Sequence, residues 1–389
     1  MNLIFFDGAE RDHLLPLTFT RPVAHCRIGI ITIAEKWEKR LEVKGSYLTQ
    51  DYLAEKYKIT YTDDNLYLNG SVCPTETLVE AVLNLEMGAV LVKDEVLIAA
   101  RLSEQIDSYA KIPIKEAIQF NGEFTYVDRP WKIFKENAAE LELDFELLTA
   151  GRKSQEISET NTLIGDRIFL EEGAKVEASI LNSTSGPIYL GKDAEIMEGS
   201  MVRGGLALGA HSVLKLGAKI YGAATFGPHV KVGGEVNNSV IFGYSNKGHD
   251  GFLGNSVLGE WCNIGADSNN SNLKNNYDEV RLWSYVKEGF EKTGLQFCGL
   301  IMGDHSKCGI NTMFNTGTVI GVSCNIYGSG FPRNFVPSFS WGGAAGFTTY
   351  NLKKALATAE RVMSRRDIPL DETETAILSH IYEGSQGDK

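Results

Sequence analysis

The clearest pattern in the chain is a large apolar residue at every sixth position through the middle of the sequence. Eight consecutive positions at this spacing are apolar: Leu190, Ile196, Val202, Leu208, Leu214, Ile220, Phe226 and Val232. Shorter runs at the same spacing lie within 164–176, 240–264 and 302–326, the second of which skips Asn246. Neither the three-to-four spacing of an amphipathic helix nor the alternation of a half-buried strand gives this period.

A six-residue period with small residues between the apolar ones predicts a β-helix, in which short strands wind around a prism. One aliphatic side chain per face points inward and stacks on its counterpart one coil away, at about 4.8 Å. Glycine often follows the repeat position, as at Gly191, Gly209 and Gly227, and glycine tolerates the positive φ of a tight corner. We expect the prism to occupy residues 163–345.

The flanking segments have other patterns. Residues 1–150 predict a small α/β domain of Rossmann-like type, which opens with a buried strand at 2–6 followed by a turn. Residues 151–162 are polar and aperiodic, as in a linker. Residues 346–389 return to a helical period, and Asp371 is placed to cap the second of two short helices. The predicted fold class is therefore α/β plus β, with short C-terminal helices.

Length, net charge and cysteine content restrict the classes of protein to which the chain can belong. The 389 residues suffice for two or three domains, and the net charge of −12 argues against a nucleic-acid binder. The six cysteines form no CxxC pair, which favours reduced thiols in a cytoplasmic protein. The first residues lack the features of a signal peptide, and no run of 18 apolar residues predicts a membrane span.

The first domain carries a loop motif. The chain has Gly8 and Arg11, then Leu-Leu-Pro-Leu-Thr-Phe-Thr-Arg over 14–21. This segment resembles the signature loop of sugar-1-phosphate nucleotidyltransferases, which wraps a nucleoside triphosphate and neutralises charge at its phosphates. The resemblance implies that UTP or dTTP reacts with a sugar 1-phosphate, with magnesium as a candidate ion. It implies nucleotide-binding roles for four residues: Gly8, Arg11, Thr18 and Arg21. The lysine that this family carries shortly after the arginine is absent.

A second motif lies in the repeat region, over 245–255 and 263–266. It resembles the acetyltransferase half of the bifunctional enzymes that make UDP-N-acetylglucosamine, which are left-handed hexapeptide-repeat transferases. The resemblance implies acetyl-CoA as acyl donor and a homotrimer with active sites between neighbouring prisms. It assigns His249 as general base and Asn263 as a contact near the transferred acetyl group. Candidate substrate or CoA ligands are Asn246, Lys247, Phe252, Asn237 and, in an inserted loop, Lys274.

Acetyl transfer to an amine needs a general base, and histidine is suited to that role. An amine must lose a proton as it attacks the thioester, and imidazole, with an unperturbed pKa near 6.5, accepts a proton at neutral pH. Alignment of amine and thioester supplies much of the remaining rate.

A column of polar residues follows the repeat positions by three: Asp193, His211, His229, His249, Asp267 and His305. If the register holds, these side chains stack along one edge of the prism. They could wall a substrate groove, bind a metal, or form a solvated corner.

These patterns favour an enzyme that acetylates an amino-sugar 1-phosphate and joins a sugar 1-phosphate to an NTP. One alternative is a nucleotidyltransferase alone, such as a glucose-1-phosphate thymidylyl- or uridylyltransferase, with an oligomerising β-helix. Another is a non-catalytic sugar-nucleotide-binding scaffold. A further alternative is a zinc enzyme similar to the carbonic anhydrases built on such a prism, which would need three histidines that converge on one metal ion.

Overall fold

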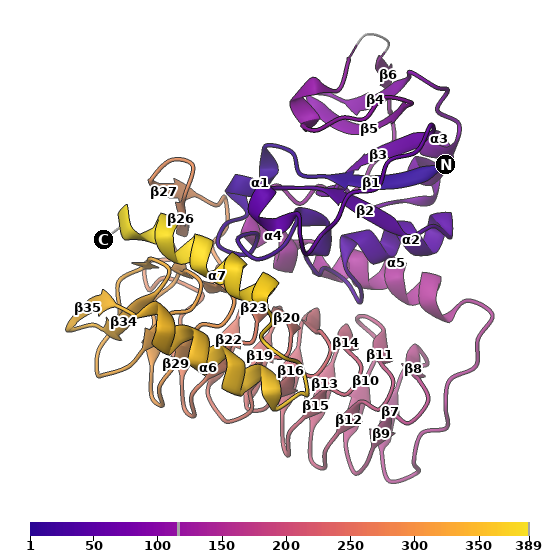
Figure 1. Ribbon diagram of the computed structural model, residues 1–389. Helices are drawn as coiled ribbons and strands as arrows, with labels where there is room; N and C mark the ends of the chain where they lie inside the picture. Colours follow the sequence, from indigo (N-terminus) through magenta and orange to yellow (C-terminus); the bar gives the residue numbers. More distant parts are fainter. Residues whose placement is uncertain (115–116, 388–389) are drawn as a thin grey trace.

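A computed structural model describes residues 1–114 and 117–387 and shows an α/β domain, a parallel β-helix and two C-terminal helices (Figure 1). The α/β domain lies along one side of the β-helix, and the C-terminal helices cross the β-helix near that domain. The predicted α/β plus β-helix architecture is confirmed.

The first domain is built on a six-stranded mixed sheet with the strand order β2-β1-β3-β5-β4-β6. Strands β2 and β3 pair with β1 in parallel, and β5 runs antiparallel to both β3 and β4. The strands are β1 (Asn2–Phe6), β2 (Gly45–Leu48), β3 (Asn65–Asn69), β4 (Val90–Lys93), β5 (Val96–Leu102) and β6 (Ala117–Gln119). The apolar run after Met1 is therefore a central, buried strand, as its composition predicts.

Five α-helices accompany this sheet in the described part of the domain. They are α1 (Glu10–His13), α2 (Ile33–Leu41), α3 (Glu76–Leu83), α4 (Pro130–Lys135) and α5 (Asn137–Thr149), with short 3-10 turns η1 (Val23–His25), η2 (Asp51–Leu53) and η3 (Tyr109–Lys111). Helix α2 begins with a capping box, in which Thr32 and Glu35 satisfy each other's backbone N–H groups. Buried ion pairs from Lys36 to Glu140 and Asp144 join α2 to α5.

The described residues of the β-helix form one sheet per face of the prism, and the strands pair in parallel except for β35, which runs antiparallel to β34 at the end of the third sheet. The first face contains β7 (Thr162–Ile164), β10 (Ile180–Asn182), β13 (Met201–Arg203), β16 (Lys219–Tyr221), β19 (Glu235–Asn237) and β22 (Phe252–Gly254). The second contains β8 (Ile168–Leu170), β11 (Ile188–Leu190), β14 (Leu206–Leu208), β17 (Ala224–Phe226), β20 (Val240–Gly243), β23 (Val257–Glu260), β28 (Leu300–Met302), β31 (Thr318–Ile320) and β33 (Phe335–Val336).

The third face contains β9 (Lys175–Val176), β12 (Glu195–Ile196), β15 (Val213–Leu214), β18 (Lys231–Val232), β21 (Asn246–Lys247), β24 (Asn263–Ile264), β29 (Lys307–Cys308), β32 (Asn325–Ile326), β34 (Ser340–Gly343) and β35 (Gly346–Thr349). Strands β25 (Asn269–Asn270) and β30 (Met313–Phe314) pair separately. The expected insertion contains an antiparallel hairpin of β26 (Arg281–Ser284) and β27 (Gly289–Lys292).

The six-residue repeat forms the interior of the prism. All eight residues from Leu190 to Val232 at this spacing are at most 2% exposed and belong to one apolar core. Residues three hexads apart pair directly across successive coils, as Val202 does with Ile220. Burial of a continuous aliphatic column is the main stabilising contribution that the sequence pattern predicts.

The expected continuation of the repeat at Val240 and Phe252 is wrong by one residue. Phe226 pairs with Ile241, Val232 with Lys247, and Val236 with Leu253. The spacing contracts here to inward residues at 236, 241, 247, 253, 258 and 264, because the corners of these coils are shorter. Val240 instead points outward, into the core shared with the first domain.

The second face of the prism is covered by the first domain. Outward residues of this face, including Val240, Phe242, Val257, Ile301 and Val319, complete the apolar core of that domain. Earlier along the prism, Leu141 and Phe145 of α5 pack on Phe169 and Tyr189. The two domains therefore share buried apolar surface rather than being joined only by the linker.

Helices α6 (Leu352–Ser364) and α7 (Glu372–Gly384) follow the β-helix, and the turn η4 (Ser385–Gly387) follows α7. Asp371 caps α7 as predicted, because its carboxylate accepts a hydrogen bond from the Glu374 N–H at 2.8 Å. The helices pack in one cluster with Val322 and Phe339 of the β-helix and Leu53 and Tyr57 of the first domain. Within 1–114 and 117–387, no helix combines the length and the apolar character that a bilayer crossing needs.

Candidate functional site

The predicted acyl-transfer residues His249, Asn263 and Asn246 line one groove of about 620 Å³ on the third face. Residues of α6 and the turn after it, Val362, Arg365 and Arg366, close one side of this groove. His249 and Asn263 are exposed, so their side chains are available to a ligand. The β-helix and the C-terminal tail together form the groove, a role for the tail that its helical period does not predict.

The floor of the groove is a ladder of outward side chains. Lys231 pairs in register with Asn246, Asn246 with Asn263, and Asn263 with Lys307. Neighbouring residues in such a ladder are about 4.8 Å apart. Asn246 and Asn263 therefore lie in one row between Lys231 and Lys307, and His249 lines the same groove.

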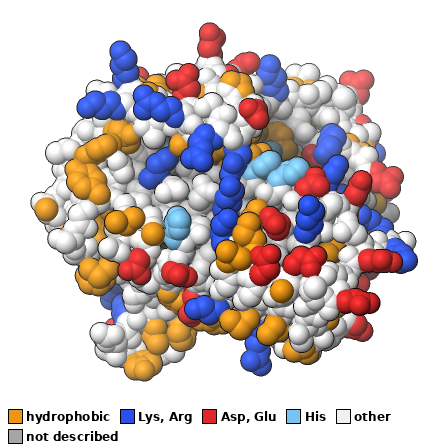
Figure 2. Space-filling view, turned by 90° about the horizontal axis from the view of Figure 1, so that it is seen from below, with side chains coloured by type: hydrophobic (Ala, Val, Ile, Leu, Met, Phe, Trp, Pro, Cys, Tyr) orange, Lys and Arg blue, Asp and Glu red, His pale blue; other side chains and the backbone are white. Residues whose placement is uncertain are grey.

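The charge of the groove has one sign. Among the described residues, its ionisable lining includes no Asp or Glu but five Lys and Arg side chains: Lys215, Lys231, Lys307, Arg365 and Arg366. None of the five forms an ion pair with a carboxylate in the described part of the chain. In the view from below, Lys and Arg side chains form a band beside histidines (Figure 2). In a chain of net charge −12, this local excess indicates an anionic ligand.

Burial perturbs two of these lysines. Desolvation lowers the pKa of Lys307 to about 8, and its ammonium donates to the His305 and Trp261 carbonyls at 2.7 and 3.4 Å. Desolvation, with the charges of Arg366 and Lys215, also lowers the pKa of Lys231. Burial therefore disfavours the charged form of both lysines, and neither forms an ion pair with a carboxylate among the described residues.

Lys247 does not line the groove but points into the prism, where it is 1% exposed. Its ammonium donates to the carbonyls of Gly233 and His249 at 2.9 and 2.8 Å, and desolvation lowers its pKa to about 8. The predicted contact between Lys247 and a substrate is therefore replaced by a role inside the protein. Lys247 holds the backbone of His249 from behind.

Three other predicted ligands lie outside the groove lining. Phe252 and Asn237 belong to strands of the first face, and Lys274 lies in the inserted loop, where it donates to the Glu279 carbonyl at 2.6 Å. The one-residue shift in the repeat explains the position of Phe252, because Leu253 takes the inward site.

The predicted histidine column is corrected by the structure. The rings of His211, His229, Tyr244, Trp261 and His305 stack in succession along one corner, with centroids 4.3 to 6.2 Å apart. His249 is not a member, because the contracted coil brings Tyr244 to its expected place. Among the described residues, no group of three or more His, Cys, Asp or Glu side chains could hold a metal ion. The donor set therefore does not fit the zinc alternative.

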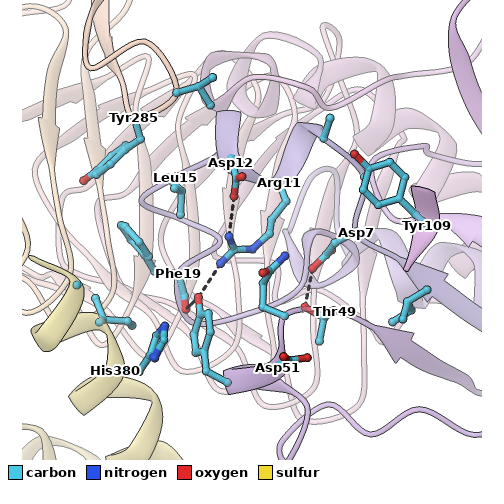
Figure 3. A pocket seen from close by; sticks show the side chains of 18 of the residues that line it. Asp7, Arg11, Asp12, Leu15, Phe19, Thr49, Asp51, Tyr109, Tyr285 and His380 are labelled. Atoms are coloured by element: carbon cyan, nitrogen blue, oxygen red, sulfur yellow. Dashed lines mark hydrogen bonds and ion pairs between the residues drawn. The ribbon is translucent and has the colours of Figure 1, made fainter. Parts of the chain in front are cut away.

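A second, larger cavity of about 930 Å³ lies at the carboxyl end of β1 (Figure 3). Gly8 and Arg11 line it, as the loop motif predicts. Arg11 donates to Asp12 at 2.7 Å, to the Tyr52 hydroxyl at 2.6 Å and to the Thr18 carbonyl at 3.2 Å. Burial raises the pKa of Asp7, another lining residue, to about 6 although it accepts a hydrogen bond from Thr49.

Thr18 and Arg21 lie outside the cavity lining. Thr18 is fully buried and donates to the Arg11 carbonyl at 2.7 Å, so it supports the loop from within. Arg21 lies at the domain interface, 3.0 and 2.5 Å from the two Asp304 carboxylate oxygens and 3.1 Å from Glu260. The expected nucleotide contact of Arg21 is therefore replaced by an ion pair to the β-helix, and Asp304 orients Arg21 rather than His305.

The sequence did not predict that residues of the inserted hairpin and of the C-terminal tail line this cavity. Tyr285 and Val286 come from the inserted hairpin, and His380, Ile381 and Ser385 come from α7 and the turn after it. These segments lie far from the loop motif in the chain. The signal in the sequence was the apolar face of the tail, which shows that the helix packs but not where.

The chain thus has two cavities, one in the α/β domain and one on the β-helix. The family model for sugar nucleotidyl transferases matches residues 3–153. Residues 3–153 thus form a sugar nucleotidyltransferase domain that is followed by a parallel β-helix, and the chain is distantly homologous to bifunctional GlmU-type proteins.

Two curated relatives carry this homology. A bifunctional sugar-1-phosphate nucleotidylyltransferase/acetyltransferase of Sulfurisphaera tokodaii is 28% identical over 232 residues, covering 58% of this chain and 50% of the relative. The bifunctional protein GlmU of Methanocaldococcus jannaschii is 26% identical over 233 residues, covering 57% and 48%. The chain spans about half the length of these relatives. Among solved structures, the UDP-N-acetylglucosamine acyltransferase LpxA of Bacteroides fragilis matches with a TM-score of 0.33 at 12% identity, over 58% of this chain and 96% of LpxA.

Proposed function

We propose that the third-face groove transfers an acyl group from an acyl-CoA thioester to the amine of an amino-sugar 1-phosphate. The observation that carries this proposal is the placement of His249 and Asn263 in one groove whose described lining has five unpaired cations and no carboxylate. Both proposed substrates are phosphorylated, so the charge of the groove matches the charge of its ligands. The names of the bifunctional relatives support the same reaction class.

In the proposed reaction, the amine nitrogen bonds to the thioester carbonyl carbon, the C–S bond breaks, and CoA leaves as its thiol. His249 accepts the proton that the nitrogen loses. Its ring nitrogens have no hydrogen-bond partner among the described residues, so one is free for this proton. The Asn263 amide, exposed one coil from Asn246, is the proposed contact to the acceptor. The acetyl group and glucosamine 1-phosphate are the first substrates to test.

The cavity of the first domain is the proposed site of nucleotidyl transfer, which joins a sugar 1-phosphate to UTP or dTTP and releases pyrophosphate. The match over 3–153 and the position of Arg11 in the cavity support this second activity. Magnesium stays a candidate ion, because at nucleotide sites it is usually held by one or two carboxylates together with substrate phosphates, and four aspartates line this cavity. No step of the proposed reaction is assigned to a metal here.

The test offers acetyl-CoA with glucosamine 1-phosphate, and separately UTP or dTTP with sugar 1-phosphates, to the same preparation. His249→Gln should abolish thiol release and leave pyrophosphate release unchanged. Arg11→Gln should do the reverse. Thiol release that is equal in the wild type and in His249→Gln would remove the acyl-transfer assignment. A cytoplasmic homotrimer is the expected setting, and sedimentation can check the trimer.

A further inference from the structure

The cavity of the first domain has few cations for a site that should hold phosphates. Four aspartates line it: Asp7, Asp12, Asp51 and Asp107. The lysine of the family's loop is absent, and Arg21 is committed to Asp304 and Glu260 at the domain interface. Among the described lining residues, only Arg11 and His380 are able to carry a positive charge.

His380 comes from the C-terminal helix α7, far from the loop in sequence. Its ring stacks on Tyr52 with centroids 4.1 Å apart and planes 14° apart. The same Tyr52 hydroxyl accepts a hydrogen bond from Arg11 at 2.6 Å and donates to the Phe19 carbonyl at 2.7 Å. Tyr52 therefore connects the arginine and the imidazole within one ordered group.

The side chain of His380 is exposed to the cavity, and Figure 3 shows it on the wall opposite Tyr109. Neither ring nitrogen has a hydrogen-bond partner among the described residues. A ring nitrogen without a protein partner, on an imidazole that stacks on the tyrosine bonded to Arg11, is suited to a phosphate oxygen.

We propose that His380 is a phosphate-binding residue of the nucleotidyl-transfer cavity and that α7 supplies the second donor that the loop lacks. The ligand class is a phosphate ester, either the triphosphate or the sugar 1-phosphate. This inference rests on the nucleotidyl-transfer half of the proposed function. It makes α7 part of the site, so the β-helix side of the molecule completes a site in the first domain.

Calorimetric titration of the full chain tests the proposal with UTP, uridine, glucose 1-phosphate and inorganic pyrophosphate. His380→Phe keeps a ring on Tyr52 but removes both nitrogens, and His380→Lys restores a donor. A hydrogen bond to a charged group predicts that His380→Phe weakens binding of the phosphate-bearing partner about tenfold or more. His380→Lys should bind within about threefold of the wild type. Loss with UTP identifies the triphosphate, and loss with glucose 1-phosphate identifies the sugar phosphate.

Two controls test whether the loss of affinity is specific to phosphate and to the His380 side chain. Uridine lacks phosphate, so its affinity should be the same in the wild type and in His380→Phe. Glu383→Gln changes a charge on the exposed side of the same helix end and should leave every affinity unchanged. Equal binding of all phosphate ligands by His380→Phe and the wild type, or equal losses for UTP and uridine, would overturn the proposal.

The two proposals can fail separately. If pyrophosphate binding depends on His380 but no NTP is turned over, the inference stands and nucleotidyl transfer fails. If NTPs are turned over with unchanged KM in His380→Phe, nucleotidyl transfer stands and the inference fails. If the wild type binds none of the phosphate ligands, both fail.

Discussion

The ion pair between Arg21 and Asp304 predicts a large stability effect at the domain interface. Both side chains are 4% exposed, and Asp304 also accepts hydrogen bonds from Thr20 and the Glu260 N–H at 2.8 and 2.9 Å. Burial alone would raise the pKa of Asp304, but the adjacent Arg21 guanidinium holds it below its ordinary value. Removing one partner leaves the other charged, buried and only partly compensated.

Asp304→Asn and Arg21→Met should each lower the free energy of unfolding by about 3–5 kcal/mol. The double variant should lose less than the sum, by at least about 2 kcal/mol, because the second substitution removes the charge that the first left unpaired. Urea unfolding at pH 7 measures all four proteins. Lys44→Met is the matched control, because its ion pair to Glu38 is 89% exposed on the lysine side and should contribute under about 1 kcal/mol.

Single substitutions at Arg21 and Asp304 that cost no more than Lys44→Met would refute this reasoning. Nucleotide binding gives a second readout. Because Arg21 does not line the cavity, folded Arg21→Met should bind UTP as the wild type does. A loss of UTP affinity at unchanged stability would instead support the contact predicted from the loop motif.

Three further predictions concern the groove. As pH rises through about 8, Lys307 loses its proton and the groove loses one cation, so KM for the acyl donor should rise between pH 7 and 9. Lys307→Arg should flatten that pH profile, because arginine keeps its charge. An unchanged slope would exclude Lys307 as the group that titrates. Lys247→Met should lower the urea midpoint, because it leaves the Gly233 and His249 carbonyls without a donor, and lower kcat about tenfold by releasing the His249 backbone. Equal kcat would contradict this positioning role. Arg365→Gln with Arg366→Gln should raise KM for acetyl-CoA about tenfold with kcat within about threefold. Substitution of the exposed Arg361 of α6, Arg361→Gln, should change neither value.

The six-residue period was sufficient to predict the prism and its interior, because each inward residue must be apolar to stack on the next coil. The period failed between Val232 and Leu258, where the corners shorten and Lys247 occupies an inward position. An aperiodic lysine looks like a surface residue in sequence, so its two carbonyl partners could not be foreseen. The same contraction displaced His249 from the ring column and brought Tyr244 into it.

The sites were predictable only where their residues are local. His249 and Asn263 lie one coil apart, so one motif includes both. Arg365, Arg366 and His380 reach the two cavities through tertiary packing of α6 and α7, and helical periodicity does not specify the surface that an apolar face will cover. The interface role of Arg21 was hidden for the same reason, because Asp304 lies 283 residues away.

The central claim is that the groove on the third face is an acyl-transfer site with His249 as its base. The most direct measurement is thiol release from acetyl-CoA with glucosamine 1-phosphate, compared between the wild type and His249→Gln at pH 7.5. We predict turnover by the wild type and a loss in kcat of about 10²- to 10⁴-fold in the variant, with unchanged pyrophosphate release. Turnover by His249→Gln within about threefold of the wild type would contradict the claim.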